Sequence, residues 1–367
     1  MTSSQTESPT PTERIPLLGS TSAEMRRSGP LANLPPYRAR QVAHWLYARG
    51  ETDFARMTDL PQPLREEFAD RYSLSPDPVA DLQKAANGEA DKYLFRLPDG
   101  RLIESVLIRT PDRVTFCISS QAGCAYGCDF CATARMGPGR NLTVREIVSQ
   151  VMALRRALVG EGREPVHNIV FMGMGEPLQN VENVIASLRL LQDPEGLGIG
   201  WRRITVSTVG LIPQILRLAE SDVSARLAYS LSATTDEVRD ALMPVNRKYP
   251  FREVFEALAA YQRRTRMPVT LEYVLLDGVN DADDDARRLG GFARDLGCKI
   301  NLITYNPHPA SPYRPTPPER VQRFLRLVEP LAPAVTLRQS KGQDILAACG
   351  QLSTRWREPA PGAEPRS

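Results

Sequence analysis

Apolar stretches alternate with amphipathic stretches through the middle and the end of the chain. Six apolar stretches have the length and residue content of buried strands: 114–119, 168–172, 204–207, 226–231, 269–275 and 299–303. Helical periodicity lies between them, near 144–158, 181–191, 213–219, 251–264 and 283–296. A seventh strand is predicted at 334–338. Alternating strands and helices indicate parallel β-α-β units, and six repeats favour a partial, TIM-like (β/α)6 barrel over a closed barrel of eight strands.

The segment before the barrel has a different pattern. Residues 1–29 are polar and rich in Ser, Thr and Pro, which predicts a disordered tail. Residues 30–75 contain two helical patterns, one between Pro36 and Gly50 and one that begins at Pro61. Together these two patterns predict a small helical accessory module.

An extension and a tail complete the predicted organisation. Strand patterns at 92–97 and 102–108 flank the turn Pro98-Asp99-Gly100. A linker and a β-hairpin extension are therefore expected over 76–112. The last two parts are expected to be the barrel core and a C-terminal tail, at 113–350 and 351–367.

Composition excludes several classes of protein. Apolar residues make up 42% and charged residues 24% of the 367 residues, as in ordinary soluble globular proteins. No apolar stretch is long enough to span a bilayer, and the N-terminal residues lack the apolar segment of a signal peptide. With six cysteines and no sign of export, a reducing, cytoplasmic location is expected. The net charge of +3 does not by itself establish a nucleic-acid partner.

Three cysteines follow the first predicted strand in a C-x-x-x-C-x-x-C run, at Cys124, Cys128 and Cys131. Thiolates are soft ligands that favour zinc or iron–sulfur clusters. A structural zinc site usually has four ligands, and no fourth ligand is near. The run therefore favours a cubane cluster with one open iron over a zinc knuckle or three unrelated cysteines. It resembles the signature of radical S-adenosylmethionine (SAM) enzymes, whose open iron chelates the amino and carboxylate groups of the methionine part.

Polar motifs follow other strands of the predicted barrel at their C-terminal ends. They are Gly173-Met174-Gly175-Glu176-Pro177, Ser207, Ser230-Leu231-Ser232 and Asn306. Reactive residues in parallel barrels gather in the loops after these ends, so a shared pocket is expected. Gly175 would allow the backbone to approach a ligand, and Glu176 would accept hydrogen bonds from an amino group. Walker and dinucleotide-binding motifs are absent from the sequence.

The remaining cysteines are isolated. A lone cysteine is usually a small buried apolar residue, and this interpretation is adopted for Cys298. Cys117 lies within the first predicted strand, and Cys349 precedes Gly350, which allows an exposed turn. Composition alone leaves the role of Cys349 open. Glu104, in L-I-E-S-V, reads by itself as a surface carboxylate of the hairpin.

From about Leu34 to Trp356 the chain resembles the radical SAM adenine methyltransferases that act on 23S rRNA and tRNA, the RlmN type. The motifs that carry the resemblance are H-W-L-Y at 44–47, M-T-D-L at 57–60, C-I-S-S-Q-A-G-C at 117–124, F-M-G-M-G-E-P-L at 171–178, L-M-P-V-N at 242–246, E-Y-V-L-L-D-G-V-N-D at 272–281 and A-A-C-G-Q-L at 347–352. The resemblance implies a radical SAM barrel, an N-terminal module that binds RNA, and methylation of carbon 2 of adenosine.

The resemblance also implies a two-step reaction that uses one [4Fe-4S] cluster and two SAM molecules. Cys349 would first take a methyl group as a thiolate. A 5′-deoxyadenosyl radical would then remove hydrogen from this methyl group, and the resulting carbon radical would add to adenine. Glu104 would accept the adenine proton, and Cys117 would release the covalent protein–RNA adduct by forming a disulfide with Cys349.

Further site residues and partners follow from the same resemblance. The residues that match SAM-binding positions are Gly175, Glu176, Ser207, Ser230, Leu231, Ser232 and Asn306. The implied partners are 23S rRNA, tRNA and an electron donor such as flavodoxin, with the protein acting as a monomer away from membranes. Ser232 stands where the family usually has histidine, so its contact is expected to be weaker or to use the backbone.

Three other functions stay open at this point. The related carbon-8 methyltransferases share the cysteines but generally have alanine after the Gly-Glu pair, so Pro177 favours carbon 2. A radical activase that makes a glycyl radical on another protein would not need Cys349 near the cluster. A structural iron–sulfur or zinc module would bind RNA without cleaving SAM.

Overall fold

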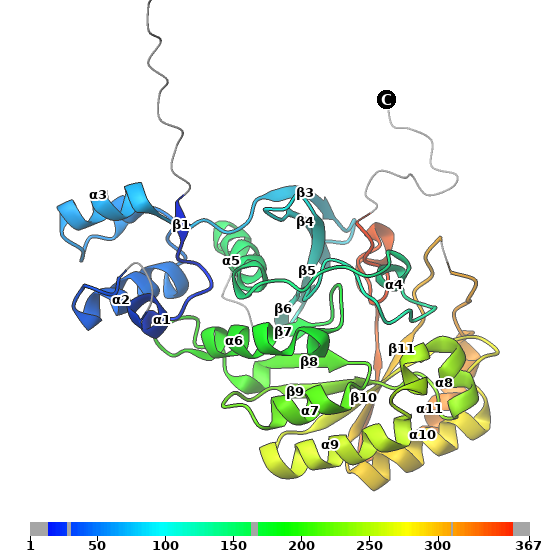
Figure 1. Ribbon diagram of the computed structural model, residues 1–367. Helices are drawn as coiled ribbons and strands as arrows, with labels where there is room; N and C mark the ends of the chain where they lie inside the picture. Colours follow the sequence, from blue (N-terminus) through cyan, green and yellow to red (C-terminus); the bar gives the residue numbers. More distant parts are fainter. Residues whose placement is uncertain (1–13, 28–30, 163–167, 310, 355–367) are drawn as a thin grey trace, which may run out of the picture.

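The computed structural model describes residues 14–27, 31–162, 168–309 and 311–354. A ten-stranded sheet runs through the molecule, with helices on its outer side and a helical module at one end (Figure 1). Its strand order, from β12 through to β3, is the reverse of the order in the chain, with no strand out of sequence. Each strand therefore pairs with its neighbours in the sequence.

Seven parallel strands form the barrel part of the sheet. They are β6 (Arg113–Cys117), β7 (Asn168–Phe171), β8 (Ile204–Thr208), β9 (Arg226–Ser230), β10 (Val269–Leu275), β11 (Lys299–Thr304) and β12 (Val335–Arg338). The side chains of β6 to β11 are largely apolar and buried, as expected for strands covered on both faces, whereas β12 has no fully buried residue. The six β-α-β connections confirm the predicted partial barrel.

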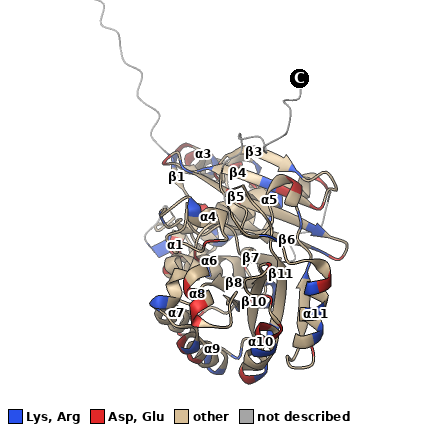
Figure 2. Ribbon diagram, turned by 90° about the vertical axis from the view of Figure 1, so that its right-hand side faces the viewer, with Lys and Arg blue, Asp and Glu red and all other residues tan. Residues whose placement is uncertain are grey.

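Helices connect these strands, and the longer ones cover the outer side of the sheet (Figure 1). They are α4 (Ala132–Arg135), α5 (Val144–Gly160), α6 (Val181–Gln192), α7 (Ile212–Ala219), α8 (Asp236–Leu242), α9 (Phe251–Thr265), α10 (Asp283–Leu296) and α11 (Pro318–Val328). The short 3-10 helices η3 (Pro177–Asn180), η4 (Trp201–Arg203) and η5 (Pro244–Arg247) lie in the loops. A capping box between Thr143 and Glu146 begins α5. Helices α4, α8 and α11 were not predicted. Figure 2 shows Lys and Arg interspersed with Asp and Glu on the outer helices.

Three antiparallel strands extend the sheet beyond β6. They are β3 (Val79–Lys84), β4 (Ala90–Arg96) and β5 (Leu102–Thr110), and β5 pairs with β6. Strands β4 and β5 are the predicted hairpin. Strand β3 was missed because nearly all of its side chains are exposed, so no apolar alternation marks it.

The N-terminal module begins earlier than predicted. It contains β1 (Ile15–Pro16), α1 (Ser22–Arg27), α2 (Pro36–Ala43), the π-helix η1 (His44–Ala48), η2 (Phe54–Arg56), α3 (Gln62–Arg71) and β2 (Tyr72–Ser73). The prediction of a disordered tail is wrong for residues 14–27, because Leu17, Leu18 and Met25 are buried in the module. Residues 1–13, also part of the predicted tail, lie outside the described residues.

The module packs directly on the barrel. Its hydrophobic cluster includes Val148 and Met152 of α5 and Leu190 of α6. The Arg155 guanidinium of α5 donates hydrogen bonds to the carbonyl groups of Tyr47 and Ala48, at the end of η1. Apolar burial and polar contacts thus fix the module on two barrel helices.

After β12, the C-terminal segment returns across the top of the barrel. It contains the 3-10 helix η6 (Gln343–Ile345), and its Gln351 and Leu352 are buried. The Leu352 carbonyl accepts a hydrogen bond from the Thr133 hydroxyl at 2.6 Å. The packed segment therefore passes the boundary predicted at residue 350. Across the described ranges, none of the helices has the length and apolar character that a membrane crossing requires.

Candidate active site

A pocket lies where the parallel strands end, beneath the C-terminal segment. The structure brings ten of the predicted site residues to its wall: Cys124, Cys128, Cys131, Gly175, Glu176, Ser207, Ser230, Ser232, Asn306 and Cys349. Three predicted residues, Glu104, Cys117 and Leu231, do not line it. The pocket thus collects groups from the loops after β6, β7, β9 and β11, from β8 and from the C-terminal segment.

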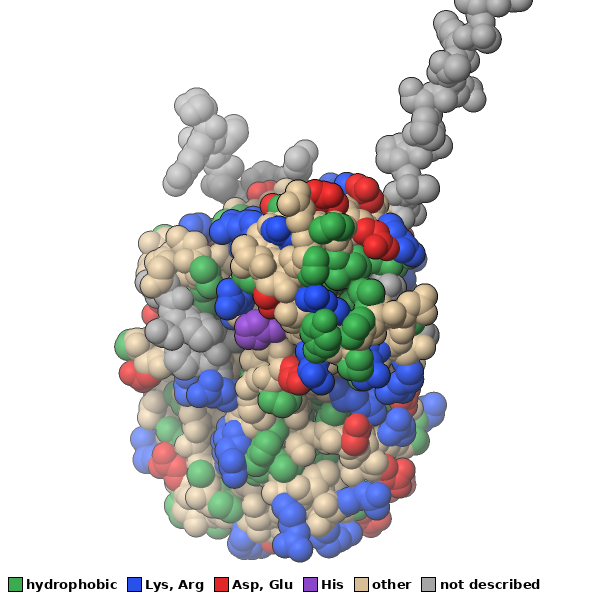
Figure 3. All heavy atoms as spheres, turned by 90° about the vertical axis from the view of Figure 1, so that its left-hand side faces the viewer, with side chains coloured by type: hydrophobic (Ala, Val, Ile, Leu, Met, Phe, Trp, Pro, Cys, Tyr) green, Lys and Arg blue, Asp and Glu red, His purple; other side chains and the backbone are tan. Residues whose placement is uncertain are grey.

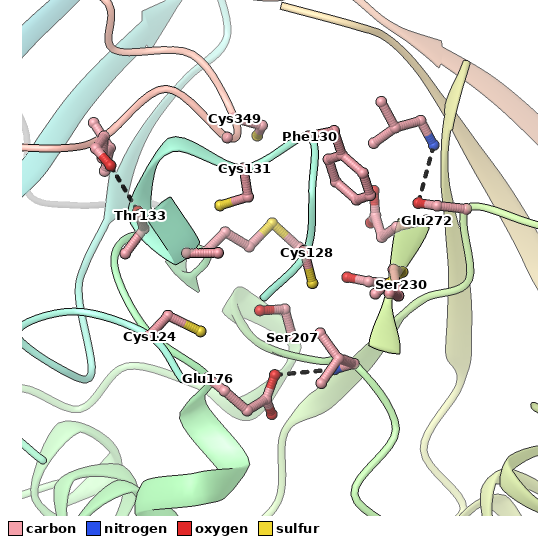
Figure 4. Close-up of a pocket in the computed structure, with 18 of the residues that line it drawn as sticks. Cys124, Cys128, Phe130, Cys131, Thr133, Glu176, Ser207, Ser230, Glu272 and Cys349 are labelled. Carbon is pink, nitrogen blue, oxygen red and sulfur yellow. Dashed lines mark hydrogen bonds between the residues drawn. The ribbon is translucent and has the colours of Figure 1, made fainter. Parts of the chain in front are cut away.

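The loop after β6 carries three cysteines whose side chains face this pocket (Figure 4). Gly127 has a φ of +65°, which allows the chain to turn between Cys124 and Cys128. Cys131 precedes the first residue of α4, and its N–H donates to the Cys128 carbonyl at 3.1 Å. In the described part of the chain, no three His, Cys, Asp or Glu side chains converge to hold a single metal ion. The thiols are instead distributed along the pocket wall.

Gly175 and Glu176 form a tightly packed corner of the pocket. Gly175 has a φ of +94°, and an added Cβ would lie 2.4 Å from the Gln121 Cβ. The Glu176 N–H donates to the Gln121 side-chain oxygen at 2.8 Å. The Glu176 carboxylate accepts hydrogen bonds from the N–H groups of Leu178 and Val209, each at 3.0 Å. Burial nevertheless raises the pKa of Glu176 to about 7, although these hydrogen bonds oppose the shift.

The hydroxyl groups of Ser207 and Ser232 have partners within the protein. The Ser207 hydroxyl donates to the Phe171 carbonyl at 2.6 Å. Ser232 has a φ of 50°, and its hydroxyl accepts a long hydrogen bond, 3.5 Å, from the Val274 N–H. Leu231 is fully buried, and its N–H donates to the Glu272 carbonyl at 3.0 Å. Leu231 therefore shapes the backbone of the wall, while Ser230 and Ser232 face the pocket.

Cys349 projects from the C-terminal segment, which lies against the cysteine loop close to Cys131 (Figure 4). The Asn306 side-chain N–H donates to the Cys349 carbonyl at 3.2 Å, and the Ala132 N–H donates to the Gly350 carbonyl at 2.7 Å. Cys349 is exposed to solvent, but the surrounding protein still raises the pKa of its thiol through desolvation. The Arg338 guanidinium opposes this rise.

Cys117 lies behind the wall at the end of β6. Burial raises the pKa of its thiol to about 12, and the charge of a Cys349 thiolate adds to the rise. The two sulfur atoms are thus near enough to interact electrostatically. Both are free thiols, and no described cysteine forms a disulfide, so the disulfide implied by the family resemblance is not present in this structure.

Comparison with known proteins identifies the family. The family of the ribosomal RNA large subunit methyltransferase N-terminal domain matches residues 15–74, and the radical SAM superfamily matches residues 118–289. A dual-specificity RNA methyltransferase RlmN from Geobacter sulfurreducens is 50% identical over 319 residues, which cover 86% of each chain. The chain belongs to the RlmN family.

Two further relatives share almost the whole length of this RlmN-family chain. A probable dual-specificity RNA methyltransferase RlmN from Moorella thermoacetica is 45% identical over 95% of this chain and 99% of its own. A crystal structure of a radical SAM methyltransferase from Sphaerobacter thermophilus is 46% identical, with a TM-score of 0.87 over 92% of this chain and 99% of that one. The helical module and the barrel therefore belong to one conserved architecture.

As an RlmN-family methyltransferase, the protein uses a [4Fe-4S] cluster and SAM. The thiols of Cys124, Cys128 and Cys131 fit this cluster, because each ligand of a cubane binds a different iron and they need not converge on one point. Burial raises the pKa of Cys124 to about 12 and raises that of Cys128 well above its usual value, so binding of the metal would have to displace the thiol protons. The bound cluster would hold SAM and supply the electron for its cleavage.

SAM binding is expected to weaken about tenfold between about pH 8 and pH 6 if Glu176 accepts a hydrogen bond from its amino group. With a pKa of about 7, Glu176 is mostly ionised at the higher pH and mostly protonated at the lower one. Isothermal titration of SAM into the cluster-loaded enzyme measures the change. Glu176→Gln should bind more weakly and lose this part of the pH dependence; an unchanged pH profile in that variant would contradict the assignment.

Glu104 lies on β5 outside the pocket wall and is 1% exposed, so its interpretation as a surface carboxylate is wrong. One carboxylate oxygen lies 3.6 Å from the Lys92 ammonium. The other accepts a hydrogen bond from the Ser353 N–H at 3.0 Å. Glu104 thus contacts the segment that carries Cys349, rather than the pocket itself.

Glu272 is a pocket residue that sequence reasoning missed. It lies in the middle of β10, and one carboxylate oxygen accepts a hydrogen bond from the Asn301 side chain at 2.8 Å. The other oxygen lies 3.8 Å from the Arg338 guanidinium. Burial raises the pKa of Glu272. The available signal was an acidic residue inside an apolar strand, which is costly unless it has a partner or a function.

Proposed function

We propose that this RlmN-family enzyme methylates carbon 2 of adenosine in 23S rRNA and in tRNA. The observation that carries the proposal is that Cys349 lies on the wall of the same pocket as the three cysteines of the β6 loop. A radical generated from SAM in this pocket would form close to a methyl group carried by Cys349. A relative with matching modules, from Geobacter sulfurreducens, is named a dual-specificity RNA methyltransferase.

In this proposal the cysteines outside the triad carry the chemistry. Cys349, as a thiolate, takes a methyl group from SAM, and its methyl carbon later adds to adenine after hydrogen abstraction. Glu104 accepts the proton from adenine. The unpaired electron left by radical addition would return to the oxidised cluster. The Cys117 thiol then attacks the Cys349 sulfur, and the bond from that sulfur to the methylene carbon breaks. The electron pair of this bond and the thiol proton complete the methyl group on adenine, and a transient disulfide remains. The electrostatic influence of Cys349 on Cys117 supports this pairing.

The other pocket residues hold SAM in the proposal. Glu176 accepts a hydrogen bond from the amino group, and Gly175 allows its close approach. Ser207, Ser230, Ser232 and Asn306 surround the rest of the molecule, and Leu231 contributes through its backbone. Their positions around one pocket support these roles.

The helical module is the proposed RNA-binding part. Its surface combines cations with aromatic rings, a pairing typical of proteins that contact unpaired bases. The Arg49 guanidinium lies 4.2 Å from the centroid of the Trp45 ring, and that of Arg38 lies 4.7 Å from the Tyr37 ring. Figure 3 shows the face that carries the module, with Lys and Arg side chains spread among hydrophobic ones.

The cellular setting is also part of the proposal. We propose a cytoplasmic monomer that receives electrons from a donor such as flavodoxin. Because the target carbon must leave the base stack to enter the pocket, free or immature rRNA should be the substrate rather than the mature ribosome. Efficient methylation of intact mature ribosomes would contradict this last point.

Anaerobic turnover tests the proposed function. The reconstituted enzyme, given reductant, SAM and unmodified 23S rRNA or tRNA, is expected to yield 2-methyladenosine together with 5′-deoxyadenosine. Mass spectrometry of the digested RNA against synthetic standards identifies the nucleoside. Appearance of 8-methyladenosine would move the reaction to carbon 8. 5′-Deoxyadenosine without a methylated base would contradict the proposal that RNA is the substrate. The absence of both products from a cluster-loaded enzyme would contradict the proposed methyltransferase activity.

A further inference from the structure

The antiparallel extension contacts the C-terminal segment along much of its length. The Lys341 ammonium lies 2.6 Å from the Glu89 carboxylate, before the first residue of β4. The Asp344 carboxylate accepts a hydrogen bond from the Ala86 N–H at 2.9 Å. Figure 1 shows the C-terminal segment, in red, passing beside α4 and the extension. The extension is therefore a support for the segment that carries Cys349.

A buried ion pair within the extension also contacts the loop of residues 346–353. Lys92 of β4 and Glu104 of β5 lie 3.6 Å apart, and their side chains are 6% and 1% exposed. The Lys92 ammonium also donates to the Leu346 carbonyl at 3.4 Å. The Glu104 carboxylate accepts from the Ser353 N–H at 3.0 Å. The pair thus contacts both ends of the loop, and Cys349 lies midway between them.

The loop has a strained backbone position at its first residue, where one of these contacts is made. Leu346 has a φ of 51°, a conformation that residues with a side chain rarely adopt without surrounding constraints. Cys349 itself is exposed and contributes little packing. A buried ion pair usually adds little to stability compared with apolar residues of similar size, because both charges lose their hydration. Its contacts with the two loop ends point instead to a positioning role.

We infer that Lys92 is a positioning residue for the methyl transfer, which fixes the 346–353 loop so that the Cys349 thiol faces the bound SAM. Lys92 lies outside the pocket and touches no reacting atom. It acts through the Leu346 carbonyl and through Glu104. The inference rests on the proposed function, in which Cys349 carries the methyl group.

Lys92→Met tests the inference, with Lys341→Met as the matched control. Lys341 joins the same segment to the same extension, but its ion pair lies outside the 346–353 loop and is more exposed. Each protein is prepared without its cluster, reconstituted, and given SAM with a deuterated methyl group in the absence of RNA. Peptide mass spectrometry then follows the label on Cys349 at several SAM concentrations.

The expected result is at least a tenfold lower maximal rate of Cys349 labelling in Lys92→Met, with cluster content and half-saturating SAM concentration unchanged. Lys341→Met should stay within twofold of the wild type. Hydrogen exchange gives a readout independent of turnover: peptides from 346–353 should exchange at least tenfold faster in Lys92→Met alone. A general loss of structure would instead lower cluster content and SAM binding together.

Labelling of Lys92→Met at the wild-type rate would overturn the inference. If Lys92→Met fails to fold, the same labelling experiment is done with Ser353→Pro. This substitution removes the N–H group that donates to Glu104 and leaves the Lys92–Glu104 ion pair in place. Slower labelling of Cys349 in Ser353→Pro supports the inference, and wild-type labelling contradicts it. Absence of label on Cys349 in the wild-type enzyme would contradict the proposed function itself, which separates the two failures.

Discussion

Cys349→Ala is expected to abolish RNA methylation, with product falling by roughly 10³-fold or more. Alanine has no nucleophilic atom, and the proposed reaction requires a thiolate to take the methyl group. No other thiol replaces it, since Cys117 is buried behind the wall and the remaining pocket cysteines belong to the triad. Nucleoside mass spectrometry after anaerobic turnover measures the loss.

Cluster loading and SAM binding should survive this substitution, because Cys349 is not one of the three cysteines of the triad and belongs to a different segment of the chain (Figure 4). Iron content and SAM titration check that the variant is otherwise intact. Cys298→Ala is the matched control, since Cys298 is a buried free cysteine outside the pocket. It should keep wild-type methylation within about twofold. Product formation by Cys349→Ala at a wild-type rate would refute the methyl-carrier role.

Cys117→Ala should trap the enzyme on its RNA. Without the second thiol, nothing attacks the Cys349 sulfur, so the bond between this sulfur and the methylene carbon persists. Less than one methylated nucleoside per enzyme is expected, and the protein should accumulate as a covalent RNA adduct. A denaturing gel detects the adduct as a slowly migrating band that ribonuclease removes.

The double variant Cys117→Ala/Cys349→Ala provides the control for this experiment. It lacks the atom through which the adduct forms, so its slowly migrating band should disappear. Multiple turnovers by Cys117→Ala without any adduct would show that Cys117 has no resolving role. An adduct that persists in the double variant would place the linkage on another residue.

The barrel was predictable because its strands are buried on both faces. Mainly apolar stretches such as Val269–Leu275 mark buried strands without strict alternation, and the helices between them carry a clear apolar face. Elements with other patterns were not predicted. Strand β3 is nearly fully exposed, and α1 has a single buried residue, Met25, so neither leaves an apolar period in the sequence.

The site was predictable as far as topology determined it. Parallel strands place their C-terminal ends at one rim, so Glu176 and Ser230 meet in one pocket although 54 positions separate them in the numbering. The contacts that the C-terminal segment makes with the barrel and the extension could not be predicted from strand topology. The hydrogen bond between Ser353 and Glu104 joins residues 249 positions apart. Such pairs depend on tertiary packing and leave no periodic signal.

The attachment of the N-terminal module has a consequence for substrate choice. Because Arg155 and the shared apolar cluster join the module to α5 and α6, its distance from the pocket is fixed rather than set by a flexible tether. In the proposed function, the module and the pocket contact the RNA at two places that are a fixed distance apart. A substrate must place its target adenosine at a fixed distance from the stem or loop that the module binds. The shape of the RNA can therefore select the adenosine even in substrates whose flanking sequences differ.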